Sequence, residues 1–188
     1  YDITELTDMA DYVYDAESLR TLAGKKYHKK KNHVNAFLKE YEGRYEYRAL
    51  TPADKGTIWQ FLNRWENGKS DDVGQHLEGE IVGIHELLNN LDKINAKIAG
   101  VFIDGQLEAF TVGSYNPTDR MAVIHIEKAN ADIRGLYTFI NQQFLVHEFA
   151  DAVLVNREDD VGMEALRKAK QSYHPIMMVR KFSMQQKR

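Results

Sequence analysis

The feature that most constrains the fold is a predicted β-hairpin at the centre of the chain. Residues 97–103 and 106–112 are two apolar, β-prone runs separated only by Asp104 and Gly105. This dipeptide suits a two-residue turn, because aspartate tolerates and glycine readily adopts the positive φ angles that such a turn requires. We therefore expect an antiparallel pair of strands here, and neighbouring elements that extend this sheet or cover it.

The apolar residues on either side of the hairpin recur with helical and strand periods in turn. They predict strands at residues 45–50, 121–127, 152–155 and 176–182, and helices around residues 34–41, 58–65, 77–91, 136–144 and 163–172. From residue 45 onward the order is strand, helix, helix, hairpin, strand, helix, strand, helix, strand, which is the element order of the GNAT acyltransferase fold. The expected fold class is therefore α/β (α+β), with a GNAT-like mixed central sheet flanked by helices. Element order does not determine the chemistry.

Composition excludes several classes of protein. The chain has 188 residues, 43% of them hydrophobic, and a net charge of −3, which fits one ordinary domain with or without a piece of a neighbour. These values do not fit a disordered chain or a uniformly basic nucleic-acid binder. The absence of cysteine excludes disulfides, thiolate chemistry and cysteine zinc sites. No apolar run approaches the roughly 18 residues that an integral membrane segment needs. We expect a cytoplasmic protein that can act peripherally at a membrane.

The first 43 residues differ from the rest. Residues 12–14 form a β-prone run with no partner strand nearby in the sequence, as expected for a strand that completes the sheet of another domain. The helix at residues 34–41 has one apolar stripe. We expect residues 1–43 to be the end of a preceding unit with a basic linker helix, and residues 44–188 to be the GNAT-like domain. Because the chain starts with Tyr1 and not with methionine, we also expect further chain upstream.

A basic segment opens this helix. Residues 25–31 contain five lysines, and histidines stand at positions 28 and 33. Such a local cluster of positive charge suits polyanions such as tRNA, phospholipid headgroups or a nucleotide phosphate, since each neutralised phosphate releases counterions. The alternative is a solvated helix start with no ligand. DNA binding is a weaker interpretation, because a short lysine run lacks the base-reading side chains that such a motif needs.

Several motifs follow one another along the chain. They are Gly-Lys-Lys-Tyr-His at 24–28 with Asn32, Ile-Glu-Lys-Ala-Asn at 126–130, Asp-Ile-Arg-Gly at 132–135, Val-Asn-Arg-Glu-Asp-Asp-Val-Gly at 155–162, and Leu-Arg-Lys-Ala-Lys at 166–170 with Tyr173 and Pro175. In this order they resemble the C-terminal family of phosphatidylglycerol lysyltransferases. The resemblance covers residues 11–182 and is most specific at residues 155–162.

The resemblance implies a tandem arrangement and two classes of donor. Soluble members of the family look like two tandem GNAT-like units, which implies an N-terminal GNAT-like unit of the same protein. Membrane-bound relatives use aminoacyl-tRNA to modify lipid headgroups, whereas typical GNAT enzymes use acyl-CoA. The expected donor is therefore acyl-CoA or aminoacyl-tRNA, with no tightly bound cofactor, and tRNA is a candidate partner. The acceptor would be a small molecule or a lipid.

The catalytic candidates are Glu127, Tyr173 and Asp159. Glu127 ends a predicted strand, where α/β sheets present ligand-binding groups, so it is the expected proton acceptor. His125 lies two residues earlier, on the same face of a regular strand, where it could assist. The resemblance implies a leaving-group proton donor at Tyr173, with Lys170 near enough to lower its pKa. The structural alternatives are an ion pair for Glu127 and core packing for His125 and Tyr173.

The remaining candidates are expected to bind the donor or its phosphates. Arg134 and Gly135 open a helix whose backbone amides can approach a phosphate, although a glycine that merely starts a helix is the alternative. The charged loop at 156–160, which includes Asp159, could recognise an amine and a carboxylate or phosphate, or simply cap the next helix. Tyr137 stands where most GNAT loops carry a small residue, which argues against ordinary acetyl-CoA binding. The predicted donor-binding set is Lys25, Lys26, His28, Lys30, Arg134, Gly135, Tyr137, Asn156, Arg157 and Lys170. No metal site is expected, because the spacing of the acidic residues matches no metal signature.

Two functional hypotheses follow. The first is an acyl or aminoacyl transferase that acts on an amine or hydroxyl acceptor by direct attack in a GNAT-like cleft. The second is a non-catalytic GNAT-like scaffold that binds a phosphate-rich ligand, which would be CoA, tRNA or a phospholipid headgroup.

Overall fold

The computed structural model describes residues 1–67, 74–91 and 93–187. Its strands are β1 (Asp2–Glu5), β2 (Asp11–Asp15), β3 (Tyr45–Ala49), β4 (Ala96–Ile103), β5 (Gln106–Asn116), β6 (Met121–Ala129), β7 (Leu154–Asn156), β8 (Met177–Val179) and β9 (Phe182–Gln185). Its α-helices are α1 (Ala16–Thr21), α2 (His28–Glu40), α3 (Lys55–Asn67), α4 (Gly74–Asn89), α5 (Leu136–His147) and α6 (Glu164–Gln171). Short 3-10 turns lie at Thr7–Met9, Lys25–Tyr27 and Pro52–Asp54.

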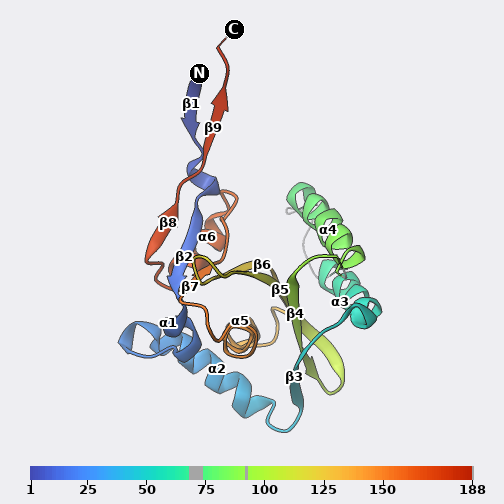
Figure 1. Ribbon diagram of the computed structural model, residues 1–188. Coiled ribbons are helices and arrows are strands. Elements are labelled where there is room, and N and C mark those ends of the chain that lie inside the picture. Colours follow the sequence, from blue (N-terminus) through green and yellow to red (C-terminus); the bar gives the residue numbers. More distant parts are fainter. Residues whose placement is uncertain (68–73, 92, 188) are drawn as a thin grey trace.

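Seven strands form one mixed sheet in the order β3-β4-β5-β6-β7-β2-β8. Every neighbouring pair is antiparallel except β6 and β7, which run parallel. Helices α3 and α4 cover one face of the sheet, and α5 covers the other with α1 and α2 beside it (Figure 1). Ile58 and Phe61 belong to the core on the first face, whereas Phe37 and Phe144 belong to the core on the second. The expected α/β class, a mixed sheet flanked by helices, is confirmed.

The central hairpin is confirmed where it was predicted. β4 pairs with β5 across Asp104 and Gly105, whose φ angles are 50° and 81°. The single strand predicted at 176–182 is wrong, because the structure divides it into β8, on the edge of the large sheet, and β9, which pairs with β1. The chain leaves the large sheet between them, at Arg180 and Lys181, and the Lys181 carbonyl accepts a hydrogen bond from the Leu6 amide instead.

The β-prone run at residues 12–14 finds its partners at the far end of the chain. It forms β2, which lies between β7 and β8 in the large sheet, and Tyr12, Val13 and Tyr14 are all buried. Residues 12–41 therefore share one core with the elements that follow them. Their derivation from a preceding unit of a longer protein stays a prediction.

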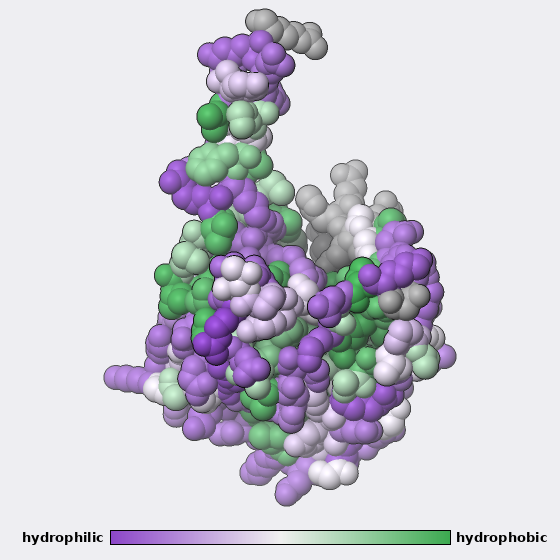
Figure 2. Space-filling view, viewed as in Figure 1, coloured by the Kyte–Doolittle hydropathy of each residue, from purple (hydrophilic) through white to green (hydrophobic). Residues whose placement is uncertain are grey.

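Strands β1 and β9 form a separate two-stranded arm. The arm stands clear of the rest of the molecule and carries both chain ends at its tip (Figures 1 and 2). Its apolar side chains Ile3, Phe182 and Met184 are exposed.

Strand β6 has two irregularities that shape its surroundings. Its pairing with β5 shifts between Val112, which faces Ile126, and Gly113, which faces Ile124, so that His125 is the extra residue of a β-bulge. Ile124 consequently packs in the core under α5, and Ile126 packs in the core under α3 and α4. In addition, β6 pairs with β7 only over its first three residues, 121–123. The carboxyl-terminal half of β6 runs on beyond the end of β7.

Candidate functional site

The carboxyl ends of the parallel strands β6 and β7 hold a nearly buried ion pair. Arg157 Nη2 donates to Glu127 Oε1 at 2.8 Å, and the two side chains are only 12% and 11% exposed. Asn141, on the inner face of α5, donates to Glu127 Oε2 at 2.8 Å. Both oxygens of the Glu127 carboxylate therefore already have partners. The ion pair that was the structural alternative for Glu127 is therefore present. The role of Glu127 as proton acceptor stays a prediction.

Arg157 is enclosed by aromatic rings. Its guanidinium lies 4.6 Å from the ring centre of Tyr173 and 5.9 Å from that of Tyr14. Burial alone would lower the pKa of Arg157, but the Glu127 carboxylate and the two tyrosines outweigh it and raise that pKa, so the group stays charged. Its Nη1 atom is buried and has no hydrogen-bond partner among the described residues. A buried cationic donor of this kind can bind an anion or a carbonyl oxygen.

Two lysines lie beside Arg157. Lys30, from α2, places its ammonium group 3.8 Å from the centre of the Tyr173 ring. Lys170, from α6, donates to the carbonyl oxygens of Arg157 at 2.6 Å and of Glu158 at 3.2 Å, and it also contacts the Asp159 carbonyl. Burial, reinforced by the charge of Arg157, lowers the pKa of each lysine to about 8. Three cationic groups thus lie near the Glu127 carboxylate, and the charges of Asp159 and Glu158 also act on Lys170.

Tyr173 is buried at the centre of this group. Its hydroxyl donates to Thr138 Oγ1 at 3.2 Å, and its carbonyl oxygen accepts a hydrogen bond from the Tyr27 hydroxyl at 3.0 Å. Burial raises the pKa of Tyr173, in part against the opposing charge of Arg157. The expectation that Lys170 lowers this pKa is wrong, because its ammonium group is directed at the loop carbonyls. Tyr173 therefore keeps its proton, as a proton donor must until it acts.

The start of α5 is covered by α2. Gly135 has a φ angle of 87°, and a β-carbon at this position would lie 2.1 Å from the carbonyl oxygen of His33. The glycine thus permits close packing of two helices, which gives it a structural role in addition to the phosphate contact predicted for it. Arg134 and Tyr137 are exposed beside this contact. Burial lowers the pKa of His33, and the neighbouring charges of Lys30 and Arg134 lower it further.

The basic segment reaches the site through one aromatic anchor. Tyr27 is buried against Tyr173, while Lys25, Lys26 and His28 on either side of it are exposed. The predicted cationic donor-binding residues therefore do not all lie together. Lys30 and Arg157 lie against the Tyr173 ring, and Lys170 contacts the Arg157 carbonyl, whereas Lys25, Lys26 and His28 are exposed outside this cluster.

The acidic loop after β7 is held by protein contacts. Asn156 Nδ2 donates to Asp11 Oδ2 at 3.0 Å, and Asn156 Oδ1 accepts from the Glu158 amide at 2.7 Å. Asp159 pairs with Lys181 at 3.2 Å. Asp160 accepts from the Tyr12 hydroxyl at 2.6 Å and pairs with Arg167 at 2.8 Å, contacts that hold the pKa of Asp160 well below its usual range. The predicted catalytic residue Asp159 thus pairs with Lys181, whereas Glu127 pairs with Arg157.

Asn141 was not predicted as a site residue, and the predicted face of His125 is wrong. Asn141 stands between the buried residues Ile140 and Phe144 on α5, and a polar residue on an apolar helix face was the available signal. His125 was expected on the same face as Glu127. Because of the bulge it lies on the α4 side, where it hydrogen-bonds Ser114 of β5.

Comparison with known proteins places the chain in a family. The model of the family described as phosphatidylglycerol lysyltransferase, C-terminal, matches residues 1–185. The chain belongs to this family. Among solved structures, a conserved protein of unknown function from Bacteroides thetaiotaomicron is 32% identical, with a TM-score of 0.90, and the match covers 96% of this chain and 60% of that one.

Two more distant structures share the fold of this lysyltransferase-family chain. L-PGS from Bacillus licheniformis is 15% identical with a TM-score of 0.64, and the match covers 96% of this chain and 60% of that one. A tandem GNAT protein from the clavulanic acid biosynthesis pathway is 12% identical with a TM-score of 0.51, over 96% of this chain and 54% of that one. The fold is therefore GNAT-like. The chain spans three fifths or less of the length of these proteins.

Within the described residues of this family member, no three histidine, aspartate or glutamate side chains gather where they could hold a metal ion. None of the helices in the described ranges is long and apolar enough to cross a membrane.

Proposed function

We propose that this chain belongs to an acyl or aminoacyl transferase and binds the donor at the carboxyl ends of β6 and β7. The observation that carries the proposal is the Arg157 guanidinium, buried between these strands with Nη1 lacking a partner in the described part of the chain. Ligands of open α/β sheets bind outside the carboxyl ends of parallel strands. Family membership and the GNAT-like fold support the same reaction class.

In the proposed reaction an acceptor amine or hydroxyl attacks the donor carbonyl carbon directly. Arg157 Nη1 donates to the carbonyl oxygen and stabilises the negative charge that develops on it. The bond from the carbonyl carbon to the leaving oxygen or sulfur then breaks, and the Tyr173 hydroxyl supplies the proton that the leaving group needs. Glu127 is the proposed proton acceptor for the nucleophile, since each carboxylate oxygen keeps a second lone pair beyond its present hydrogen bond.

Both proposed donors, aminoacyl-tRNA and acyl-CoA, are phosphate-rich. The exposed residues Lys25, Lys26 and His28 lie next to the site through Tyr27 and would neutralise phosphates. We favour the tRNA ester, because the His33 carbonyl already lies against Gly135, where a GNAT enzyme would place the pyrophosphate of CoA. The acceptor would be a small molecule or a lipid headgroup reached from solution.

The test is a titration of the protein with CoA and with aminoacyl-tRNA at several salt concentrations. We expect tighter tRNA binding with a steep salt dependence, weakened by Lys30→Ala and also by Lys25→Ala. Lys39→Ala is the control, because this lysine is exposed at the other end of α2, outside the basic segment at residues 25–31. CoA binding that does not depend on salt and is lost in Arg134→Ala would instead indicate that the donor is an acyl-CoA thioester.

The second candidate is a non-catalytic scaffold for a phosphate-rich ligand. It is favoured by the ion pairs that Glu127 and Asp159 make without any substrate. The two candidates differ in whether the protein catalyses transfer. If the protein binds tRNA but transfers no labelled aminoacyl group to lipid vesicles or to a panel of amines, the scaffold hypothesis is correct. If it binds neither donor, the proposed donor site is wrong.

A further inference from the structure

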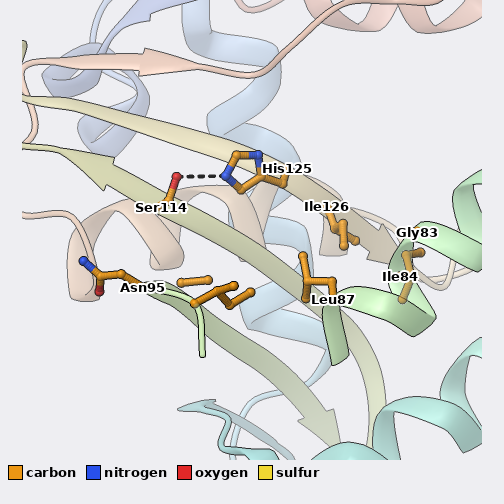
Figure 3. A pocket seen from close by; sticks show the side chains of 9 residues that line it. Gly83, Ile84, Leu87, Asn95, Ser114, His125 and Ile126 are labelled. Carbon is orange, nitrogen blue, oxygen red and sulfur yellow. Dashed lines mark hydrogen bonds between the residues drawn. The ribbon is translucent and has the colours of Figure 1, made fainter. Parts of the chain in front are cut away.

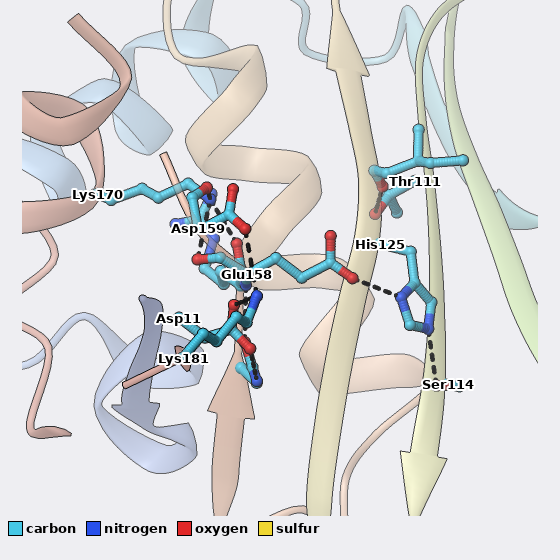
Figure 4. Close-up of polar contacts among 11 residues, drawn as sticks. Asp11, Thr111, Ser114, His125, Glu158, Asp159, Lys170 and Lys181 are labelled. Atoms are coloured by element: carbon cyan, nitrogen blue, oxygen red, sulfur yellow. Dashed lines mark hydrogen bonds and ion pairs between the residues drawn. The ribbon is translucent and has the colours of Figure 1, made fainter. Parts of the chain in front are cut away.

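A second arrangement of reactive side chains lies on the opposite face of β6 from Glu127. Ser114 Oγ is 2.8 Å from His125 Nε2, and His125 Nδ1 is 2.8 Å from Glu158 Oε1 (Figure 4). The three residues come from β5, from β6 and from the loop after β7. A hydroxyl on one imidazole nitrogen and a carboxylate on the other is the arrangement that turns serine into a nucleophile, whatever fold carries it.

The backbone holds each member of this trio in place. The β-bulge directs His125 toward Ser114. Glu158 has a φ angle of 56°, its amide donates to Asn156 Oδ1, and its carbonyl oxygen accepts hydrogen bonds from the Tyr12 amide and from Lys170. A non-glycine residue in the left-handed region persists only where its surroundings fix it. The orientation of the imidazole is therefore set before any substrate arrives.

The trio is accessible and borders an apolar cavity. The side chains of His125 and Glu158 are 35% and 43% exposed. Ser114 and His125 form part of the wall of an open cavity of about 610 Å³ between α4 and the sheet, which is otherwise lined largely by Ile84, Leu87 and Ile126 (Figure 3). An apolar chain bound in this cavity would bring an attached carbonyl group to Ser114.

We propose that Ser114, His125 and Glu158 form a nucleophilic site that cleaves esters or thioesters with an apolar acyl chain. Ser114 Oγ bonds to the carbonyl carbon while its proton passes to His125 Nε2, and Glu158 stabilises the resulting imidazolium. The bond from the carbonyl carbon to the leaving oxygen or sulfur breaks, and the leaving group takes the proton from His125. Water then attacks the acyl-serine and gives a proton to His125. The ester bond to Ser114 breaks, Oγ recovers the proton, and a carboxylic acid is released.

The test uses a rhodamine-tagged alkyl fluorophosphonate, which reacts with activated serines, on the intact protein. We expect one adduct, mapped to Ser114 by mass spectrometry, that is absent from Ser114→Ala. The rate of labelling should fall at least about 100-fold in His125→Ala and about tenfold or more in Glu158→Gln. Ser172→Ala is the matched control, because this exposed hydroxyl contacts only the Ala169 carbonyl in the described structure and should not affect labelling.

Several outcomes would overturn this proposal. Absence of an adduct on the unmodified protein, or an adduct on another serine, would show that the trio is only a set of structural hydrogen bonds. Mapping the adduct on the unmodified protein makes this test independent of whether the variants fold. Binding of aminoacyl-tRNA to Ser114→Ala should be unchanged, so failure here leaves the proposed transferase site untouched.

The role of the cavity in binding the acyl chain can be tested with esters of different acyl-chain length. Hydrolysis of p-nitrophenyl octanoate should be faster than that of p-nitrophenyl acetate. Leu87→Trp, which fills the cavity beside His125, should slow octanoate hydrolysis about tenfold relative to acetate hydrolysis. Equal slowing of both esters would show that the acyl chain binds elsewhere.

Discussion

The positive charge of Arg157 is neutralised by a carboxylate in direct contact with it. Glu127 balances the guanidinium, and Asn141 completes the hydrogen bonds of the carboxylate. Removing one partner of a buried pair leaves the other desolvated and unpaired, which costs far more than the net contribution of the intact pair. Arg157 and Glu127 therefore have to be changed together if the site is to be studied in a folded protein.

We expect Arg157→Met to lower the free energy of unfolding by about 3–5 kcal/mol, because it leaves the Glu127 carboxylate buried without its cation. The double variant Arg157→Met/Glu127→Gln should recover more than half of that loss, since glutamine still accepts from Asn141. Urea denaturation measures both. Arg44→Met, which breaks the exposed pair with Asp104, is the control and should have a much smaller effect. A double variant no more stable than Arg157→Met would contradict this account.

The two lysines of the site titrate near neutral pH. Because burial lowers the pKa of Lys30 to about 8, the lysine loses its positive charge as the pH rises through that value. The affinity for a phosphate-rich donor should therefore fall between pH 7 and pH 9. Lys30→Arg should reduce this dependence, since arginine stays charged throughout the range. Binding titrations across the range measure the effect, and an identical fall in the arginine variant would exclude Lys30 as its source.

Among the elements, the contact between α2 and α5 determines the shape of the site. It brings Lys30 over Tyr173 and leaves Arg134 at the edge. Gly135, at the start of α5, lies against α2, with its missing β-carbon directed at the His33 carbonyl.

Gly135→Ala should destabilise the protein by at least about 2 kcal/mol, from the strain of a positive φ angle and from the clash with His33. Gly24→Ala is the matched control. Its φ angle of 89° is similar, but a β-carbon there meets nothing within 4 Å, so only the backbone strain applies. The difference between the two variants, measured by urea denaturation, reports on the helix contact. Equal losses of stability would mean that the contact contributes nothing.

Local signals in the sequence predicted most elements but not their long-range contacts. Asp104-Gly105 was enough for the hairpin, and helical periodicity was enough for α5, because these signals lie within a few residues. The bulge at His125 inserts one residue into an otherwise regular apolar strand and leaves no compositional trace. The pairing of Glu127 with Arg157 spans 30 residues and depends on where β6 and β7 diverge. The sequence therefore offered Glu127 and Arg157 as candidates, but neither their pairing nor the part of Asn141 in it could be predicted.

At the scale of the whole molecule, stability is distributed unevenly. The core strands β5 and β6 are buried and pair with each other over most of their length, whereas β1 and β9 pair only with one another and are exposed. An isolated two-stranded pair is marginally stable in water. The arm is thus the part of the described structure least protected by packing.

Hydrogen exchange should show this difference directly. Backbone amides of β1 and β9 are expected to exchange at least about 100-fold faster than those of β5 and β6, because they open without disturbing the core. Mass spectrometry of peptic fragments resolves the two regions. Similar protection in the arm and the core would mean that the arm is held by contacts absent from this chain alone.

The position of β2 has a consequence for the order of folding. This strand pairs with strands that lie more than 130 residues later in the sequence, at 154–156 and 177–179. During synthesis it leaves the ribosome before these partner strands have been made, so its tyrosines cannot yet pack between them. Contacts of such sequence separation close slowly, because the loop entropy has to be lost before the contact forms. β2 can therefore join the large sheet only after β7 and β8 have been made, and until then the nascent chain exposes an apolar strand to chaperones or to aggregation.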